Sequence, residues 1–515
     1  MTKPRLLLIN PRVCSQRGMR LPLSLLALGA VLEGRYDYSI IDGNVDADPV
    51  RTALATIAAD PHSLVGMTVM PGPQVAPAIR IASALRTAHP RLPIAWGGYF
   101  PTLYTDAAIN APYVDYAVRG QGEETLLDLL GQLQDAGPKH RAASALRTEG
   151  LETIRGLTWK DKGGAIVHNP DRPFRQPDAY PLLPYDRVGD VARYLRPSFL
   201  GARTAVHQAA IGCRYRCTFC GVASMFNGQT HLQGPERLLS VLTTLRDQYG
   251  ATAMQYYDHN FFDREETSIP LLEVLGRVEL PYWCYARADT LANFSAQTWG
   301  LVRRSRLRMA YIGAEAANDA VLKGMKKGTR IEHTLEVAAR CRENAVIPEF
   351  SFILGGPADP EGETEKTLDF VKRIKTIHPE CEVILYYYSP TPQRDPGQIK
   401  DDSSPHLPFL SQYGPSGPAL PTTPEEWTQP KWVQYVCHQD APWLSERMRR
   451  RVKDFARVLA CRFPTVQDVR TPAWGKSVLS SLSRWRYATG RYDRPWELEM
   501  ARRLIPLRDP QKESL

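Results

Sequence analysis

Apolar residues in the first part of the chain form short runs, and segments with helical periodicity separate them. Up to about residue 135 the two kinds of segment alternate, as they do in right-handed βαβ units. The expected strands are Arg5–Ile9, Tyr38–Ile41, Leu64–Val69, Ile94–Trp96 and Tyr113–Val118. The expected helices are Leu21–Leu32, Val50–Ala59, Val75–Ala88 and Glu123–Leu133. The pattern predicts an α/β fold with a doubly wound, Rossmann-like parallel sheet covered by helices on both faces.

The same alternation returns about six times between residues 200 and 395. The expected strands there are Ala205–Ala210, Ala253–Tyr257, Tyr282–Ala286, Arg308–Ile312, Pro348–Leu354 and Glu382–Tyr388. In parallel βα arrays, ligands bind at the carboxyl ends of the strands. Those ends are therefore where functional residues are expected in both halves of the chain.

The two remaining stretches lack this alternation. Residues 141–199 predict a linker, in which Leu157–Lys160 and Ala165–His168 flank Asp-Lys-Gly-Gly as a β-hairpin. Residues 396–515 begin as a loop-like stretch rich in Pro, Ser and Asp, and we expect the rest to form a mostly helical domain that shapes a substrate pocket. The expected domains are 1–140, 141–199, 200–395 and 396–515.

Composition places the chain among globular proteins, because 43% of its 515 residues are hydrophobic and 23% are charged. The longest apolar run, Leu21–Leu32, is too short to span a bilayer, and the amino terminus reads as a first strand rather than a signal peptide. Nine cysteines, an odd number with no secretion signal, favour a reducing compartment. We therefore expect a cytoplasmic protein.

The formal net charge is +9 and the sequence pI is about 9.0. Lys and Arg residues are scattered along the chain and are densest in its last hundred residues, as in Arg447–Lys453. A solvated helix face is the first interpretation of that run, and an anionic substrate or a membrane surface is the alternative. Nucleic acid is not an expected partner.

The most specific chemical signal is the C-x3-C-x2-C spacing of Cys213, Cys217 and Cys220. A [4Fe–4S] cluster takes one ligand per iron, usually four cysteines, so three leave one iron free to chelate a small molecule. The alternatives are a zinc knuckle or three buried thiols. Zinc would require a fourth Cys or His nearby, and His207 lies upstream on an expected strand.

This spacing resembles the radical S-adenosylmethionine (SAM) enzymes, in which SAM binds the open iron and is cleaved to a 5′-deoxyadenosyl radical. The resemblance implies a [4Fe–4S] cluster, SAM, and a partial (β/α)6 TIM barrel with the cysteine loop after its first strand. It further implies SAM contacts at the ends of later strands, from Tyr257, Asp258, Arg287, Glu315, Gly355 and Gly356. Asp258 or Glu315 could equally be a helix cap or a buried ion-pair partner. Most other cysteines are expected to be small buried hydrophobes.

The strand ends of the first array carry small and turn-prone residues, which allow close backbone approach to a ligand. Those singled out are Thr68, Met70, Gly97, Gly98, Gly120, Gly122 and Glu123. Taken singly, each glycine is a plain turn or helix cap. Gly-Gly-x-x-Pro-Thr at 97–102 and Arg-Gly-x-Gly-Glu at 119–123 resemble the cobalamin-binding domain of one radical SAM class. Because no Asp-x-His-x-x-Gly follows the first strand, the resemblance implies cobalamin held without a histidine lower ligand.

Together these resemblances imply a cobalamin-dependent radical SAM enzyme. They imply that the radical removes hydrogen from a substrate and that methylcobalamin then methylates an unactivated carbon, which no acid or base could activate. The substrate expected is a small molecule or lipid-like metabolite. The expected electron donor is a flavodoxin or ferredoxin.

Three other functions stay open at this point. An anaerobic cyclase resembling that of magnesium-protoporphyrin IX monomethyl ester would use cobalamin for oxidation, and product mass separates it from methylation. Radical methylthio transfer would require further cysteines in the first domain, where Cys14 stands alone. A non-enzymatic cobalamin sensor would not need the cysteine triad.

Overall fold

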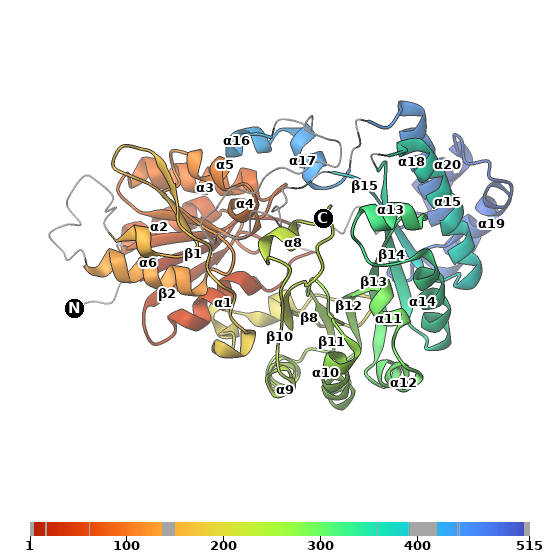
Figure 1. The fold of residues 1–515 in the computed structure, drawn as a ribbon, viewed down its shortest axis with the longest axis horizontal. Helices are drawn as coiled ribbons and strands as arrows, with labels where there is room; N and C mark the ends of the chain where they lie inside the picture. Colours follow the sequence, from red (N-terminus) through yellow and green to blue (C-terminus); the bar gives the residue numbers. More distant parts are fainter. Residues whose placement is uncertain are drawn as a thin grey trace.

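The computed structural model describes residues 5–15, 18–60, 62–135, 150–356, 358–389, 391, 420–439, 441 and 443–508. Two sheets flanked by helices lie side by side, and a helical tail extends over both (Figure 1). Each sheet contains a run of parallel strands, so the predicted α/β fold class is confirmed.

The first sheet has the strand order β2-β1-β3-β4-β5-β6-β7. Its five parallel strands are β1 (Arg5–Asn10), β2 (Asp37–Asp42), β3 (Leu64–Thr68), β4 (Ile94–Gly97) and β5 (Tyr116–Val118). Its helices are α1 (Leu23–Leu32), α2 (Pro49–Ala59), α3 (Val75–Ala88), α4 (Tyr99–Leu103), α5 (Thr105–Asn110) and α6 (Glu123–Asp135). Alternate residues of β1 enter two different hydrophobic clusters, one on each face, because helices cover both faces of the sheet.

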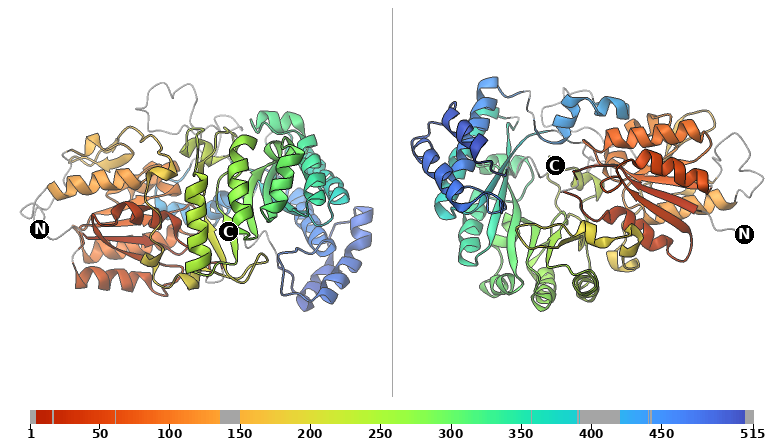
Figure 2. Two further views of the ribbon diagram at one scale, coloured as in Figure 1. Left: turned by 90° about the horizontal axis from the view of Figure 1, so that it is seen from below. Right: turned by 180° about the vertical axis from the view of Figure 1, so that it is seen from behind.

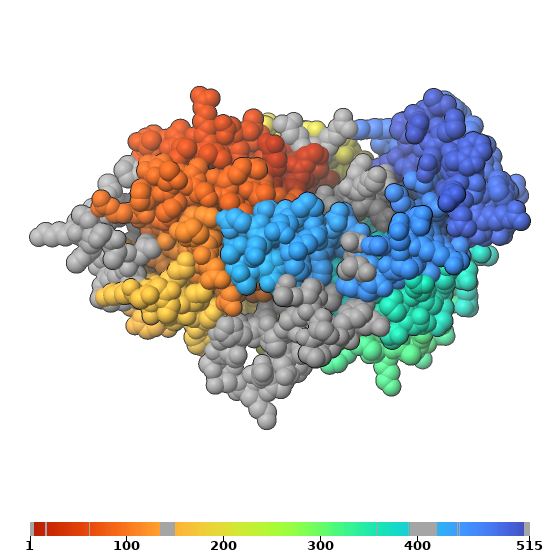
Figure 3. All heavy atoms as spheres, turned by 90° about the horizontal axis from the view of Figure 1, so that it is seen from above, coloured from red at the N-terminus to blue at the C-terminus, as the bar shows by residue number. Residues whose placement is uncertain are grey.

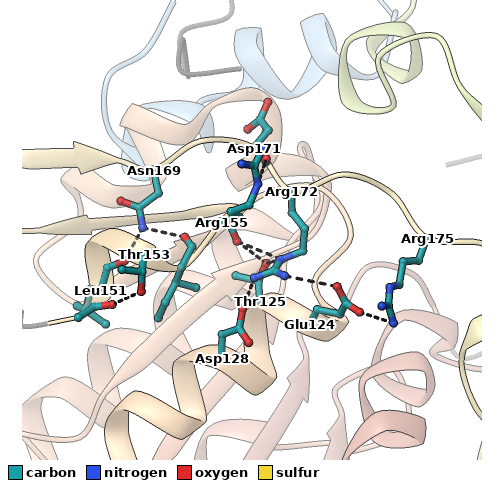
Figure 4. A network of polar contacts seen from close by, with 12 residues as sticks. Glu124, Thr125, Asp128, Leu151, Thr153, Arg155, Asn169, Asp171, Arg172 and Arg175 are labelled. Atoms are coloured by element: carbon teal, nitrogen blue, oxygen red, sulfur yellow. Dashed lines mark hydrogen bonds and ion pairs between the residues drawn. The ribbon is translucent and has the colours of Figure 1, made fainter. Parts of the chain in front are cut away.

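The predicted hairpin is present, but it belongs to this sheet. Strand β6 (Leu157–Lys160) pairs antiparallel with β5, and β7 (Ile166–His168) pairs with β6. Figure 4 shows the polar network that ties the hairpin region to α6. Arg172 donates to Thr125 at 2.9 Å and pairs with Glu124 at 3.4 Å, and Arg175 reaches Glu124 at 2.7 Å. Part of the stretch predicted as a linker is therefore built into the first sheet.

The second sheet is entirely parallel, with the order β15-β14-β13-β12-β11-β8. Its strands are β8 (Thr204–His207), β11 (Ala253–Tyr256), β12 (Tyr282–Arg287), β13 (Leu307–Glu315), β14 (Ile347–Leu354) and β15 (Glu382–Tyr387). Its helices are α9 (Pro235–Thr243), α10 (Glu265–Val278), α11 (Ala288–Ala292), α12 (Ala296–Arg304), α13 (Asp319–Gly324), α14 (Ile331–Glu343) and α15 (Pro360–Ile377). Within the described residues the edge strands β8 and β15 do not pair, so the sheet forms a partial barrel.

One predicted strand is divided in two. The sequence predicts a single strand over 205–210, whereas β8 ends at His207 and a separate strand, β9 (Ala210–Gly212), pairs antiparallel with β10 (Thr230–Leu232). The chain leaves the barrel at this point because the Ala210 N–H is bound by the Asp258 carboxylate rather than by a neighbouring barrel strand. The cysteines therefore lie between the two strands of a short hairpin that is separate from the barrel sheet.

The tail has two parts with different partners (Figures 2 and 3). Helices α16 (Pro424–Trp427) and α17 (Pro430–Val436) pack on the first domain, where Trp427 joins the core beside Tyr104 with ring centroids 4.3 Å apart. Helices α18 (Glu446–Arg462), α19 (Ala473–Thr489) and α20 (Trp496–Leu504) continue the core of the barrel instead. The predicted helical tail is thus present and serves both halves, while residues 392–419 lie outside the described residues.

Candidate functional site

The three cysteines lie between β9 and β10, and α8 (Gly221–Met225) begins directly after Cys220. Cys217 is buried, and Cys213 and Cys220 are partly exposed. Burial raises the pKa of the Cys213 thiol, and burial together with the Cys217 thiol raises the pKa of Cys220 to about 12. The charges of Arg287 and Lys327 act in the opposite direction on the pKa of Cys213. The thiols are close enough to influence one another and face positive charge that would stabilise them as thiolates.

The donor set suits a cluster better than a single ion. In the part of the chain that the structure describes, no three His, Cys, Asp or Glu side chains converge closely enough to hold one metal ion. Ligands of a [4Fe–4S] cluster bind separate irons and need not converge on one point. Three thiols around one hairpin loop, with cations beside them, fit such a cluster.

Arg287 packs against the cysteine loop. Its Nη1 lies 3.8 Å from the Cys217 sulfur, and its guanidinium lies over the Tyr215 ring at 3.4 Å from the centroid. Two 2.9 Å hydrogen bonds join it to Asp289, and it also donates to the Lys327 carbonyl. Burial by itself would lower the pKa of Arg287, but the Asp289 carboxylate outweighs it and the pKa is raised. Arg287 is a fixed positive charge beside Cys217.

Glu315 and Lys327 form a buried ion pair in the same region. Lys327 Nζ donates to Glu315 Oε1 at 2.6 Å, and both side chains are almost fully buried. Glu315 is held at φ +63°, a left-handed conformation that costs energy for any residue with a side chain. Burial would lower the pKa of Lys327, but the Glu315 carboxylate raises it overall. Sequence reasoning identified Glu315 and missed Lys327, whose only signal is the Lys-Lys-Gly turn after α13.

The end of β11 contains polar groups without partners. Asp258 binds the Ala210 N–H through one carboxylate oxygen, and burial raises its pKa to about 8. Its other oxygen has no partner among the described residues, and neither does the amide of Asn260, which is completely buried. Buried polar groups in native proteins are almost always hydrogen-bonded. Polar atoms left free beside the cysteine loop fit the amino and carboxylate groups of a bound SAM.

The remaining predicted SAM contacts lie in different surroundings. Gly355 has φ +73°, and its carbonyl accepts a 2.7 Å hydrogen bond from Trp443 of the tail. Gly356 is buried, and among the described residues a Cβ on it would meet no atom within 4 Å, which leaves room for a ligand atom. Tyr257 is partly exposed and its ring lies 6.1 Å from that of Trp283.

The inner face of the barrel is lined with aromatic rings. Trp283 and Tyr285 share one face of β12 with Arg287, since alternate residues of a strand point the same way. Tyr285 lies 4.6 Å from Trp283 and 5.0 Å from Tyr311 of the next strand, measured between ring centroids. Tyr285 and Tyr311 are partly exposed although they belong to the inside of the barrel. This aromatic surface begins next to Arg287, at the carboxyl end of β12, and extends toward the amino ends of the barrel strands.

Two carboxylates stand at the base of this surface. Glu349 accepts a 3.2 Å hydrogen bond from the Trp283 indole N–H, and Gln467 of the tail donates at 2.9 Å to both Glu349 and Glu382. Burial, and then the neighbouring Glu382, raise the pKa of Glu349 to about 7.

In the first sheet the predicted residues follow neighbouring strands β3, β4 and β5. Gly98 has φ +95°, and a Cβ there would lie 3.0 Å from the Thr68 hydroxyl oxygen. Met70 is 49% exposed, and its N–H donates to Gln74 at 2.7 Å. Together with Gly97 at the end of β4, these residues lie at the carboxyl ends of the parallel strands, and we call this surface the open edge of the first sheet. It carries no charge among these residues and fits a large planar ligand such as a corrin.

Of the three predicted residues after β5, Gly120 lies at the open edge, whereas Gly122 and Glu123 are packed where α6 begins. The Gly120 N–H donates to Thr102 at 3.1 Å, which places it beside the α4 end of the edge. A Cβ on Gly122 would lie 3.4 Å from Val118, so this glycine serves the packing of helix on strand. Glu123 is buried at the start of α6, and burial raises its pKa.

The open edge of the first sheet and the carboxyl end of the barrel come together at the cysteine loop. Gly221, which follows Cys220, packs on α4: an added Cβ would lie 2.7 Å from Leu103 and would overlap the Tyr99 hydroxyl. Tyr99 is partly buried and lies so near the loop that burial and then Cys220 raise its pKa. The cysteine loop therefore lies directly beside the helix that follows Gly97 and Gly98.

Comparison with known proteins agrees with this arrangement. Residues 18–130 match the B12 binding domain and residues 209–371 match the radical SAM superfamily, which together cover more than half of the chain. An uncharacterized methyltransferase of Pyrococcus horikoshii is 24% identical, over 71% of this chain and 76% of its own. The anaerobic magnesium-protoporphyrin IX monomethyl ester cyclase of Synechocystis is 23% identical, over 73% of this chain and 69% of its own.

Two solved structures share the fold. The cobalamin-dependent SAM radical enzyme OxsB aligns with a TM-score of 0.62 and 19% identity, over 74% of this chain and 53% of OxsB. The radical SAM methyltransferase TsrM of Kitasatospora setae aligns with a TM-score of 0.59 and 19% identity, over 75% of each chain. This chain thus spans about half the length of OxsB. The chain belongs to the radical SAM enzymes whose radical SAM domain is preceded by a B12 binding domain.

Proposed function

We propose that the protein is a C-methyltransferase that acts on an unactivated carbon of a small-molecule or lipid-like metabolite. The observation that carries the proposal is the contact between Gly221 and α4, because it brings the open edge of the B12 binding domain up to the cysteine loop. Methyl transfer to a carbon from which hydrogen has been removed requires both cofactors to reach the same atom, and adjacent sites meet that requirement.

Each side of the site has a defined task. When bound, the cluster, SAM and cobalamin supply the hydrogen removal and the methyl group. Cys213, Cys217 and Cys220 would hold the cluster, and Arg287 would offset the negative charge of the thiolates. Asn260, whose amide has no partner among the described residues, offers this amide to the methionyl part of SAM. The protein positions these groups and keeps water from the reacting carbon.

The barrel lining supports a substrate with a flat or extended apolar body. Aromatic side chains bury such a body and leave few polar groups to satisfy. Glu349 at the base of that surface would favour a donor group at the far end of the substrate. An electron must also reach the cluster, and we propose a flavodoxin or ferredoxin as its source.

The test begins with the protein reconstituted anaerobically with iron, sulfide and cobalamin. We expect about four irons and one corrin per chain, and release of 5′-deoxyadenosine when reductant and SAM are added. With methyl-labelled SAM and a pool of aromatic and lipid metabolites, mass spectrometry should find a product heavier by one labelled methylene unit. Cys217→Ala serves as the matched blank, and a corrin-free protein that still forms this product would contradict the proposal.

The cyclase is the second candidate, because the Synechocystis relative carries that name and aligns over 73% of this chain. It predicts an oxidised, cyclised product without the label. The same incubation therefore separates the two candidates.

A further inference from the structure

Exposed apolar side chains are concentrated in one part of the tail. Among the described residues, eight of the ten exposed large apolar side chains lie between Val469 and Leu504, and Met70 and Leu182 are the other two. Isolated exposed apolar residues are ordinary, but a cluster of this kind marks an interaction surface. The cluster lies at the end of the molecule farthest from the first sheet (Figure 1).

On α19 the exposed large apolar residues recur every three or four positions. Trp474, Val478, Leu482 and Trp485 therefore form one stripe along the helix, and Trp474 is 66% exposed. A different residue, Leu479, makes the buried contact with the barrel core. The helix thus has an apolar stripe beyond the one that packing requires.

The next helix repeats this arrangement. Trp496, Met500 and Leu504 recur every fourth position on α20, with exposures of 65%, 59% and 85%. Leu498 is fully buried and anchors the helix on another face. Gly475 near the start of α19 packs against Ile505 after the end of α20, so the two helices run antiparallel.

The turn between the helices is fixed by Arg486, which is buried. It donates at 3.0 Å to the carbonyls of Arg491 and Asp493 and at 2.9 Å to Glu497 at the start of α20. The hairpin of α19 and α20 is therefore a firm element that presents its apolar stripes, rather than a loosely packed chain end.

Charge identifies the partner. Residues 443–508 contain 16 Lys and Arg residues against 6 Asp and Glu residues, a net +10 compared with +9 for the whole chain. Arg470, Arg484, Arg494 and Arg503 are exposed around the stripes. A second copy of the chain would bring like charges together, whereas an anionic lipid surface attracts the arginines and accepts the apolar residues. Tryptophan favours the boundary between lipid headgroups and acyl chains.

We propose that the α19–α20 hairpin docks the protein on the surface of a membrane that contains anionic lipid. The helices lie in the plane of the interface, with the Trp, Met and Leu stripes among the headgroups and the arginines on lipid phosphates. Among the described residues, no helix is both long and apolar enough to cross a bilayer, and docking at the surface requires none. The proposal stands independently of the reaction the enzyme catalyses.

The experiment is sedimentation of the full chain with phosphatidylcholine vesicles, with and without phosphatidylglycerol. We expect binding that needs phosphatidylglycerol, weakens with salt and shifts tryptophan emission to the blue. Trp474→Ser/Trp496→Ser should reduce the partition coefficient about tenfold or more, since each buried apolar side chain adds to interfacial binding. Leu182→Ser, which removes an exposed leucine on another part of the surface, should have no effect.

A charge-reversal pair completes the test. Arg484→Glu/Arg503→Glu should weaken binding about tenfold or more, while Arg277→Glu/Arg303→Glu, at exposed arginines of α10 and α12, should not. Thermal unfolding and iron content show that each variant has folded. The proposal is overturned if wild type ignores the vesicles, if the control variants lose as much binding as the stripe variants, or if the stripe instead mediates a dimer that Trp474→Ser/Trp496→Ser dissolves.

Discussion

The carboxyl ends of the parallel strands of the two sheets meet at the cysteine loop, yet they are built from different kinds of residue. At the barrel edge, charged groups are buried and paired, as Arg287 is with Asp289 and Lys327 with Glu315. At the edge of the first sheet, Gly98 and Met70 contribute shape and no charge. The first kind of edge suits ionic ligands and the second suits a large ring system held by contact.

This difference determines what a substitution does. A buried charge that loses its partner is costly, so single changes in the barrel should have large effects on stability and metal content. A glycine edge is sensitive to added volume and to backbone conformation, whose costs are smaller. The comparison can be tested by changes that are matched between the two edges.

The largest effect is expected from Cys217→Ala. Iron content should fall from about four per chain to near zero, and 5′-deoxyadenosine release should stop, because two thiolates do not hold the cluster. Corrin binding, which depends on the other edge, should persist. Cys14→Ala, at a half-buried cysteine outside the triad, is the control and should keep its iron. Equal iron loss in both variants would contradict the assignment.

The next effect is expected from Glu315→Gln, which leaves Lys327 buried without its carboxylate. The free energy of unfolding should fall by about 3–5 kcal/mol, as measured by denaturant titration. Glu315→Gln/Lys327→Met should recover most of that loss. Glu336→Gln breaks a surface pair with Arg340 and should cost less than about 1 kcal/mol. A SAM affinity that stays low in the double variant would assign Glu315 to SAM as well.

A smaller effect concerns pH and involves the barrel alone. The pKa of Glu349 is raised from its ordinary value of 4.5 to about 7, so the folded state holds its proton more tightly than the unfolded state. The resulting stability is complete below pH 4.5 and is lost as the pH rises to about 7. It amounts to roughly 3 kcal/mol. Glu349→Gln should flatten this part of the stability profile, and an unchanged slope would show that Glu349 does not titrate there.

The smallest effect is expected at the first edge. Gly98→Ala places a side chain at φ +95° and should lower the unfolding free energy by about 1–2 kcal/mol. Corrin content should fall while iron content stays constant. Gly131→Ala, in α6 at a position where no described residue would meet the added Cβ, should stabilise the protein by about 0.5–1 kcal/mol. Iron loss in Gly98→Ala would show that the two edges do not act separately.

The sequence predicts both sheets well because parallel strands buried on two faces read as regular apolar runs between amphipathic helices. It also predicts the cysteine site, since all three thiols lie within one loop and their spacing is local. The sequence does not predict where the barrel strand before this loop ends, because the break after His207 depends on a contact with Asp258, which lies 48 positions beyond Ala210.

Three features of the structure could not be predicted in this way. Lys327 reaches Glu315 through a turn whose course depends on the tertiary fold, so nothing in its neighbours marks it as a partner. Nothing in the sequence around Trp427 shows which surface it packs on, and in the structure it joins the core of the first domain. The hairpin over 157–168 was recognised as a hairpin, while its pairing with β5 depends on a strand about 40 positions earlier.

The position of Trp427 has a consequence for synthesis of the protein on the ribosome. Its partners Phe100 and Tyr104 emerge about 300 residues earlier, so the nascent first domain waits for this part of its core for roughly 15–60 s at 5–20 residues per second. During that interval an apolar face of the domain stays uncovered and is a ready target for chaperones. Once α16 has emerged from the ribosome it can close that face, and this step comes late in the assembly of the domain.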